Sequence, residues 1–206
     1  FLLGGPVGSM EFTGWTVTFP VMGIRIRKLY PVVTALFLTV GNSLPAAAQS
    51  SVDEMLEALR SAEPAEATRL TREIERAWAQ SGSTSLDMLL RRGRDALKEE
   101  RLDIAIEHLT AVTDHAPDFA EGWHARATAY YMKGLYGPAL DDLQRALILN
   151  PDNYNAIFGL GIMLQEFGDY RRAEEAFDRV LDLHPNHEDA NTAMDQLKRR
   201  GIGREL

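Results

Sequence analysis

The sequence predicts an all-α protein built from repeated pairs of helices, and three observations support this. Alanine and leucine abound, while runs of β-branched residues, which favour strands, are few. Three prolines stand 34 residues apart, at Pro117, Pro151 and Pro185. Small and large apolar residues recur at fixed offsets between them. Self-similarity at such a period is typical of stacked helical units, because each unit buries its apolar face against its neighbours.

The repeat becomes visible when each proline is placed at position 32 of a 34-residue unit. The three units are then 86–119, 120–153 and 154–187. Two positions are small in every unit, as close helix packing requires: Gly93, Ala127 and Gly161 at position 8, and Ala105, Ala139 and Ala173 at position 20. Two others are large and apolar: Leu89, Trp123 and Ile157 at position 4, and Leu109, Leu143 and Phe177 at position 24.

Each unit should contain two helices, and glycines and prolines mark their ends. Gly134 and Gly168 share position 15, where glycine suits the left-handed backbone that ends a helix. Glu100 takes that place in the first unit. The proline ends the second helix because it lacks an N–H and clashes with the preceding turn. We therefore expect a helix–turn–helix in every unit, with the proline at the boundary.

This arrangement resembles the tetratricopeptide repeat (TPR) family over residues 86–187. The resemblance implies antiparallel helix pairs that stack into a right-handed superhelix with a concave face. It also implies a protein that catalyses nothing and binds a peptide or a partner protein in the concave groove.

Both flanks of the repeats are predicted to be helical. Residues 188–206 contain an apolar stripe at helical spacing and form a capping helix with a short tail. Residues 49–85 begin with Ser51-x-x-Glu54, a capping-box pattern, and Pro64 starts a second helix. Glu75 would fall at a core position of a fourth repeat. We therefore expect a non-repeat helical hairpin that covers the open end of the stack.

The first 48 residues are expected to lie outside the fold. Residues 22–48 join a basic start, a short apolar stretch and an A-x-A site, which is typical of a secretory signal peptide cleaved before Gln49. The apolar stretch is shorter than the roughly 20 residues of a membrane span, although an uncleaved inner-membrane anchor is the alternative. Residues 1–21 are expected to be a non-native upstream extension, with Met10 or Met22 as the true start.

Composition excludes several classes of function. The formal net charge is −8, which disfavours nucleic-acid binding because that binding depends on neutralising phosphates. The chain has no cysteine, so it can hold neither a disulfide nor a thiolate metal site. We predict no cofactor and no membrane span in the mature chain. The sequence leaves the oligomeric state open.

The TPR resemblance places the partner-binding residues on the first helix of each unit, facing the concave groove. The candidates are Leu90, Arg94, Lys98, His124, Thr128, Tyr131, Asn155, Phe158, Ile162 and Gln165. They suggest an extended or amphipathic peptide with an acidic group near Arg94 and Lys98. Two alternatives stay open: a solvated inner face, or a groove covered by the N-terminal hairpin.

The family resemblance suggests one further site to look for, the carboxylate clamp of heat-shock co-chaperones. It needs lysine, asparagine and arginine at five places, which here hold Leu90, Arg94, Ala125, Asn155 and Gly159. The clamp is therefore absent, and a chaperone C-terminal tail is not the expected ligand.

Other candidate sites lack the patterns that chemistry requires. "RRGR" (91–94) lies within a helix without the glycine-rich loop of a phosphate site. His184 and His187 flank Pro185 without a third metal ligand at a fixed spacing. We predict no catalytic, cofactor-binding or metal residues. The function predicted is a protein-interaction adaptor or scaffold of the bacterial cell envelope, secreted and periplasmic. A self-assembling structural protein and a metal-binding protein are the alternatives.

Overall fold

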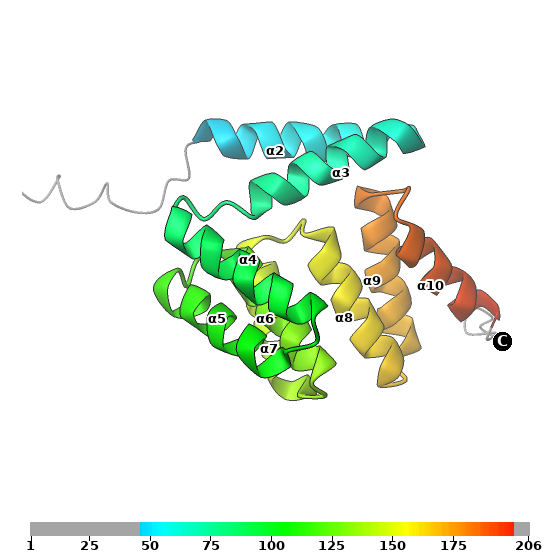
Figure 1. Cartoon of the computed structure of the whole chain (residues 1–206). Coiled ribbons are helices and arrows are strands. Elements are labelled where there is room, and N and C mark those ends of the chain that lie inside the picture. The colour runs from blue at the N-terminus through cyan, green and yellow to red at the C-terminus, as the bar shows by residue number, and fades with distance from the viewer. Residues whose placement is uncertain (1–45, 200–206) are drawn as a thin grey trace, which may run out of the picture. The chain divides into compact units, whose positions relative to one another are not determined.

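The computed structural model describes residues 46–199, and these fold into helices joined by short turns (Figure 1). The predicted upstream extension and residues 22–45 of the predicted signal peptide lie outside the described residues. The helices in the described range are α2 (Ala46–Leu59), α3 (Pro64–Trp78), α4 (Thr84–Lys98), α5 (Leu102–His115), α6 (Ala120–Met132), α7 (Tyr136–Leu149), α8 (Tyr154–Glu166), α9 (Tyr170–Leu183) and α10 (Glu188–Arg199). The all-α prediction is confirmed.

Three helix pairs correspond to the three repeats: α4 with α5, α6 with α7, and α8 with α9. The turn inside each pair uses a left-handed residue at position 15. Gly134 and Gly168 have φ of 75° and 78°, and Glu100 adopts φ of 54° without the freedom of glycine. In all three turns the next backbone N–H bonds back across the helix end, as Arg101 N does to Ala96 O at 2.8 Å.

The small residues at position 8 are explained by the side chain at position 24 of the same unit. A Cβ added to Gly93 would lie 2.5 Å from Leu109, and one added to Gly161 would lie 2.5 Å from the ring of Phe177. Leu109 and Phe177 are fully buried. The large side chain of the second helix therefore fills the space that the glycine of the first helix leaves.

The N-terminal hairpin of α2 and α3 lies on the third repeat, which corrects the expectation that it covers the open end beside the first. Leu70 and Ile74 of α3 are buried in one cluster with Tyr154 of α8 and Val180 of α9. The exposed side chains of α4, such as Arg91, are mostly charged or polar, with Met88 as the exception. The helix α2 also begins at Ala46, so Ser51 lies inside it instead of capping it.

The C-terminal helix α10 packs against α9. Its apolar stripe of Ala193, Met194 and Leu197 is buried in one cluster with Ala173 and Phe177 of α9. The exposed side of α10 is polar. Among the described residues, every helix is too short or too polar to cross a bilayer.

Candidate functional site

A small polar pocket of about 180 Å³ lies where α3 meets the first helices of the three repeats. We call it the hairpin pocket. Its lining residues are Glu75 and Trp78 of α3, Arg94 of α4, Glu121 and His124 of α6, and Asn155 of α8. It brings together Arg94, His124 and Asn155, three of the predicted partner-binding residues.

Glu121 is the centre of the charge network in this pocket. Its carboxylate is buried and accepts hydrogen bonds from the guanidinium of Arg94, from His124 Nδ1 at 3.1 Å and from Asn153 Nδ2 at 3.2 Å. Burial by itself would raise the pKa of Glu121, but His124 and Arg94 outweigh it and lower that pKa below its usual value. The carboxylate is therefore charged at neutral pH, and His124 Nδ1 carries a proton.

This network corrects the expected role of Arg94. We expected its charge to attract an acidic group of a ligand, but Glu121 of the same protein already neutralises it. Lys98 was expected to share that role, and it is exposed and lies 3.2 Å from Asp95 on its own helix. A surface pair of this kind is weak, and it does not join Lys98 to the hairpin pocket.

The hairpin contributes the remaining wall, so the groove is partly covered, as one of the alternatives anticipated. Glu75 accepts a hydrogen bond of 2.9 Å from Asn155 Nδ2. The ring of Trp78 packs against that of Tyr154, with centroids 5.0 Å apart. Asn186 Nδ2 donates to the carbonyl of Ala62 at 2.8 Å, and this bond ties the turn of the hairpin to the end of the third repeat.

A cluster of exposed apolar side chains lies at the turns of the second and third repeats. We call it the turn patch, and it consists of the exposed Met132, Leu135, Tyr136 and Phe167 together with the partly buried Tyr131. The ring of Tyr136 meets those of Tyr131 and Phe167 edge-on, with centroids 6.0 Å and 5.5 Å apart. Phe167 is 51% exposed. Exposed aromatic residues gathered in this way mark surfaces that bind other molecules.

Tyr131 joins the turn patch to the concave groove. Its hydroxyl donates to Glu166 at 2.6 Å. Partial burial and the neighbouring Glu166 carboxylate raise the pKa of Tyr131 to about 12, so the phenol stays protonated at neutral pH. On α6, His124, Thr128 and Tyr131 stand at the i, i+4 and i+7 positions of one helix face. This face therefore runs from the hairpin pocket to the turn patch.

One predicted groove residue lies in the protein core, and three others are partly buried. Leu90 is 1% exposed and lies in the apolar cluster of the first repeat, so its prediction as a partner-contacting residue is wrong. Phe158 is half-buried against the rings of Phe177 and His187. Ile162 and Gln165 are likewise partly buried, and Ile162 packs on the cluster between α9 and α10. These side chains support the groove from below.

Sequence reasoning missed the side chains that lie outside the repeat pattern. Glu75 comes from the hairpin, which has no repeat register to predict a facing direction. Trp78 continues the apolar stripe of Leu70 and Ile74, so the sequence does predict that it faces inward, but not that it lines a pocket. Tyr136 and Phe167 follow the first helices, beyond the positions assigned to the groove. Their signal was present, because Phe167 stands at a position that holds Glu99 and Lys133 in the other units.

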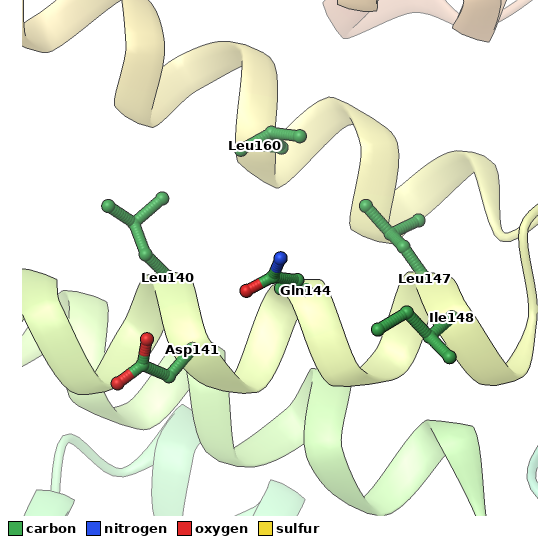
Figure 2. Close-up of a pocket in the computed structure, with 6 residues that line it drawn as sticks. All are labelled: Leu140, Asp141, Gln144, Leu147, Ile148 and Leu160. Atoms are coloured by element: carbon green, nitrogen blue, oxygen red, sulfur yellow. The ribbon is translucent and has the colours of Figure 1, made fainter.

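A second, apolar groove of about 400 Å³ lies between α7 and α8. Figure 2 shows Leu140, Gln144 and Leu147 of α7 pointing toward α8, with Leu160 opposite them. Ile148 at its edge is 66% exposed, and Asp141 also lines the groove. The repeat pattern did not predict this groove, because it assigned neither exposed apolar residues nor a cavity to the second helix.

The two candidate metal histidines form part of the junction between the hairpin and the third repeat. The rings of His184 and His187 lie 5.4 Å apart, and both pack edge-on against Tyr154. His184 Nε2 is 3.1 Å from the hydroxyl of Thr71 on α3. Burial, and then the neighbouring His187, lower the pKa of His184 to about 4. This site is aromatic packing between neutral imidazoles.

Comparison with known proteins places the repeats in a family. Two tetratricopeptide repeat models match residues 90–154 and 133–197, which together span more than half of the chain. A TPR repeat-containing protein of Rhizobium etli is 28% identical over 144 residues, covering 70% of this chain and 71% of its relative. A human protein SGT1 homolog is 32% identical over 101 residues, but these are 49% of this chain and 28% of that protein.

Solved structures share the same fold. The first TPR of Spaghetti (RPAP3), bound to the HSP90 peptide SRMEEVD, superposes with a TM-score of 0.54 at 24% identity, covering 57% of this chain and 94% of that one. MamA superposes with a TM-score of 0.52 at 23% identity, covering 68% of this chain and 80% of the MamA chain. TPR domains mediate protein–protein interactions and bind peptides, and proteins of the family are typically non-enzymatic adaptors. The repeat register, the helix pairs and these matches agree, and the chain belongs to the tetratricopeptide repeat family.

Proposed function

We propose that this protein is a non-enzymatic adaptor of the bacterial cell envelope that binds a peptide segment of a partner protein along its concave face. The observation that carries the proposal is the turn patch. The rings of Tyr136 and Phe167 are exposed, Tyr136 contacts the partly buried ring of Tyr131, and Tyr131 lies on the α6 face that leads to the hairpin pocket.

The turn patch is not something that the repeat fold requires. Met132, Phe167 and Leu135 stand at positions 13, 14 and 16 of their units. The equivalent positions in the other units are charged: Lys98 and Glu166, Glu99 and Lys133, Arg101 and Asp169. Because charged side chains serve the same turns equally well, the apolar residues of the turn patch are best explained by an interaction that buries them.

The dimensions of the α6 face suit a short extended segment. His124 and Tyr131 are seven residues apart, which on an α-helix is about 10 Å. An extended peptide advances about 3.3 Å per residue, so about four residues would reach from the hairpin pocket to the turn patch. Thr128 lies between the two and is exposed.

Site-specific photo-crosslinking tests this proposal directly. A photoreactive amino acid replaces Thr128, and a control chain carries it at Asp178, an exposed position on α9. We expect a crosslinked partner in the envelope fraction from Thr128 and not from Asp178, and a synthetic peptide of the partner's crosslinked segment should compete. Equal crosslinking at both positions, or none at Thr128, would contradict groove binding.

The envelope location rests on the signal-peptide pattern of residues 22–48 and needs its own experiment. N-terminal sequencing of the protein recovered from the periplasm should begin at Gln49. Recovery of the protein from the cytoplasm with an intact leader would remove the envelope from the proposal and leave peptide binding to be judged separately.

Self-assembly is the second candidate, and the groove between α7 and α8 supports it. Ile148 and the leucines of this groove are available for contact with another copy of the chain. Light scattering across a concentration series tests it. Association that Ile148→Asp abolishes would favour a structural role, and a monomer at high concentration would exclude it.

A further inference from the structure

We propose that the hairpin pocket binds a cationic group of the bound peptide, a lysine or arginine side chain. This inference rests on the proposed function, and it names the chemistry that one end of the groove recognises. It also reverses the expectation from the sequence, which assigned an acidic group to this part of the groove.

The first argument is the charge balance of the pocket. Two carboxylates, Glu75 and Glu121, and one guanidinium, that of Arg94, line it. The ion pair between Arg94 and Glu121 cancels one charge of each sign. Within residues 46–199 Glu75 has a neutral hydrogen-bond donor, the amide of Asn155, and forms no ion pair. His124 also lines the pocket, and while its imidazole is neutral the charge that remains for a ligand is negative.

The second argument is that an incoming anion would meet an unfavourable site. Arg94 already donates to Glu121, which balances its charge, and an anion at the remaining N–H groups would lie beside this buried carboxylate. Such an anion would also lie within the same small pocket as Glu75. Like charges held within one small pocket repel each other.

The third argument is the aromatic wall. Trp78 lines the pocket beside Glu75, and its ring is held in place by Tyr154. A cation over an indole face is attracted by the ring quadrupole, and tryptophan gives the strongest such interaction among the aromatic residues. A carboxylate and an indole side by side match the charged head and the apolar stem of a lysine or arginine.

The size of the pocket limits the ligand to one side chain. Its volume of about 180 Å³ is below the roughly 300–1,000 Å³ of ordinary small-molecule sites. The α6 face leads out of it toward the turn patch, so the rest of a ligand can continue along the groove. The motif that fits is a basic residue followed, about three residues later, by an apolar one.

The test uses four synthetic peptides and the full chain. Each acetylated and amidated tetrapeptide, X-Ser-Gly-Leu, carries arginine, lysine, norleucine or glutamate at X. Binding is followed by the NMR signal of the Trp78 indole N–H, with the signal of Trp123 as an internal reference. We expect the arginine and lysine peptides to bind about tenfold more tightly than the other two, given the strength of a partly exposed cation–π contact beside a carboxylate.

Matched variants identify the group responsible. Glu75→Gln keeps a hydrogen-bond acceptor for Asn155 and removes the charge, so the tenfold preference should disappear. The control is Glu73→Gln on the same helix. Glu73 pairs with Arg69 outside the pocket, so the variant should keep the preference for the cationic peptides. Three outcomes would overturn the inference. They are tighter binding of the glutamate peptide, a preference that survives Glu75→Gln, and no shift of the Trp78 signal with any peptide.

These outcomes separate the inference from the proposed function. Equal binding of all four peptides, with crosslinking at Thr128, would leave groove binding intact and reject the cationic ligand. An absence of crosslinking at Thr128 would reject groove binding itself.

Discussion

The buried carboxylate of Glu121 on α6 is held by the guanidinium of Arg94 on α4, so an ion pair ties the first two repeats together beneath the concave face. The side chain of Glu121 is 7% exposed and that of Arg94 is 35% exposed. The pair also decides the electrostatics of the hairpin pocket, because it removes the positive charge that Arg94 would otherwise present to a ligand. Stability and recognition therefore depend on the same contact.

Glu121→Gln should destabilise the protein at neutral pH by about 1–3 kcal/mol, because it leaves Arg94 without its counter-charge in a partly buried site. The pKa of Glu121 is lower in the folded protein than its usual value, so the wild-type stabilisation is complete above about pH 4.5 and is lost as the pH falls through the folded value. Urea unfolding at pH 7 and at pH 3 measures both effects. Glu107→Gln, at an exposed position on α5, is the control and should change little.

The junction between the hairpin and the third repeat should weaken in mild acid. Burial lowers the pKa of His184 to about 4 from an ordinary 6.5, so the unfolded chain binds more protons than the folded one between these values. The free energy of unfolding should therefore fall as the pH falls from about 6.5 to about 4. His187, Tyr154 and Thr71 face this ring, and burial also lowers the pKa of His187.

The variant His184→Asn tests that pH dependence. Urea unfolding at pH 7.5 and pH 5 should show a smaller difference in the variant than in the wild type. An equal difference in the two proteins would show that other groups carry the pH dependence. Tryptophan fluorescence can monitor the loss of the Trp78–Tyr154 contact. It would report whether the hairpin separates from the third repeat before the repeats unfold.

Glu100→Gly should stabilise the protein by about 1 kcal/mol. Glu100 ends α4 with φ of 54°, a conformation in which a side chain costs energy and glycine does not. The two equivalent turns already have glycine there. A gain of that size corresponds to a rise of about 2–4 °C in Tm for a domain of this length. The neighbouring change Glu99→Gly, where φ is −91°, lacks this benefit and should lower Tm.

Gly161→Ala and Gly159→Ala should differ in sign although both glycines lie on α8. The added Cβ of Gly161→Ala would lie 2.5 Å from the buried ring of Phe177, and crowding of this kind costs about 1–3 kcal/mol. At Gly159 the nearest atom, of Leu143, is 3.7 Å away. There the higher helix propensity of alanine should stabilise the protein by up to about 1 kcal/mol. Thermal unfolding of both variants measures the contrast, and destabilisation by both would contradict it.

The repeat pattern predicted the helix pairs because its information is local. A proline that cannot continue a helix, a glycine that ends one and a small residue opposite a large one each act within a single unit, as Gly161 and Phe177 illustrate. The same pattern failed at Leu90. The repeat register assigned this residue to the groove, but the packing of α4 on α5 and α6 buries it. The repeat register predicts the direction in which a side chain points, but not how far neighbouring residues bury it.

The amino-acid sequence by itself determined the family, the three repeats and the helical nature of both flanks, because backbone constraints and apolar spacing are properties of neighbouring residues. The tertiary structure decided where the hairpin lies and what the groove presents. Leu70 and Ile74 meet Tyr154 and Val180, which lie 80 or more residues away, and this contact places Glu75 and Trp78 in the wall of the groove. Pairings over such separations depend on which apolar surfaces remain uncovered once the repeats have stacked, and no local pattern encodes that.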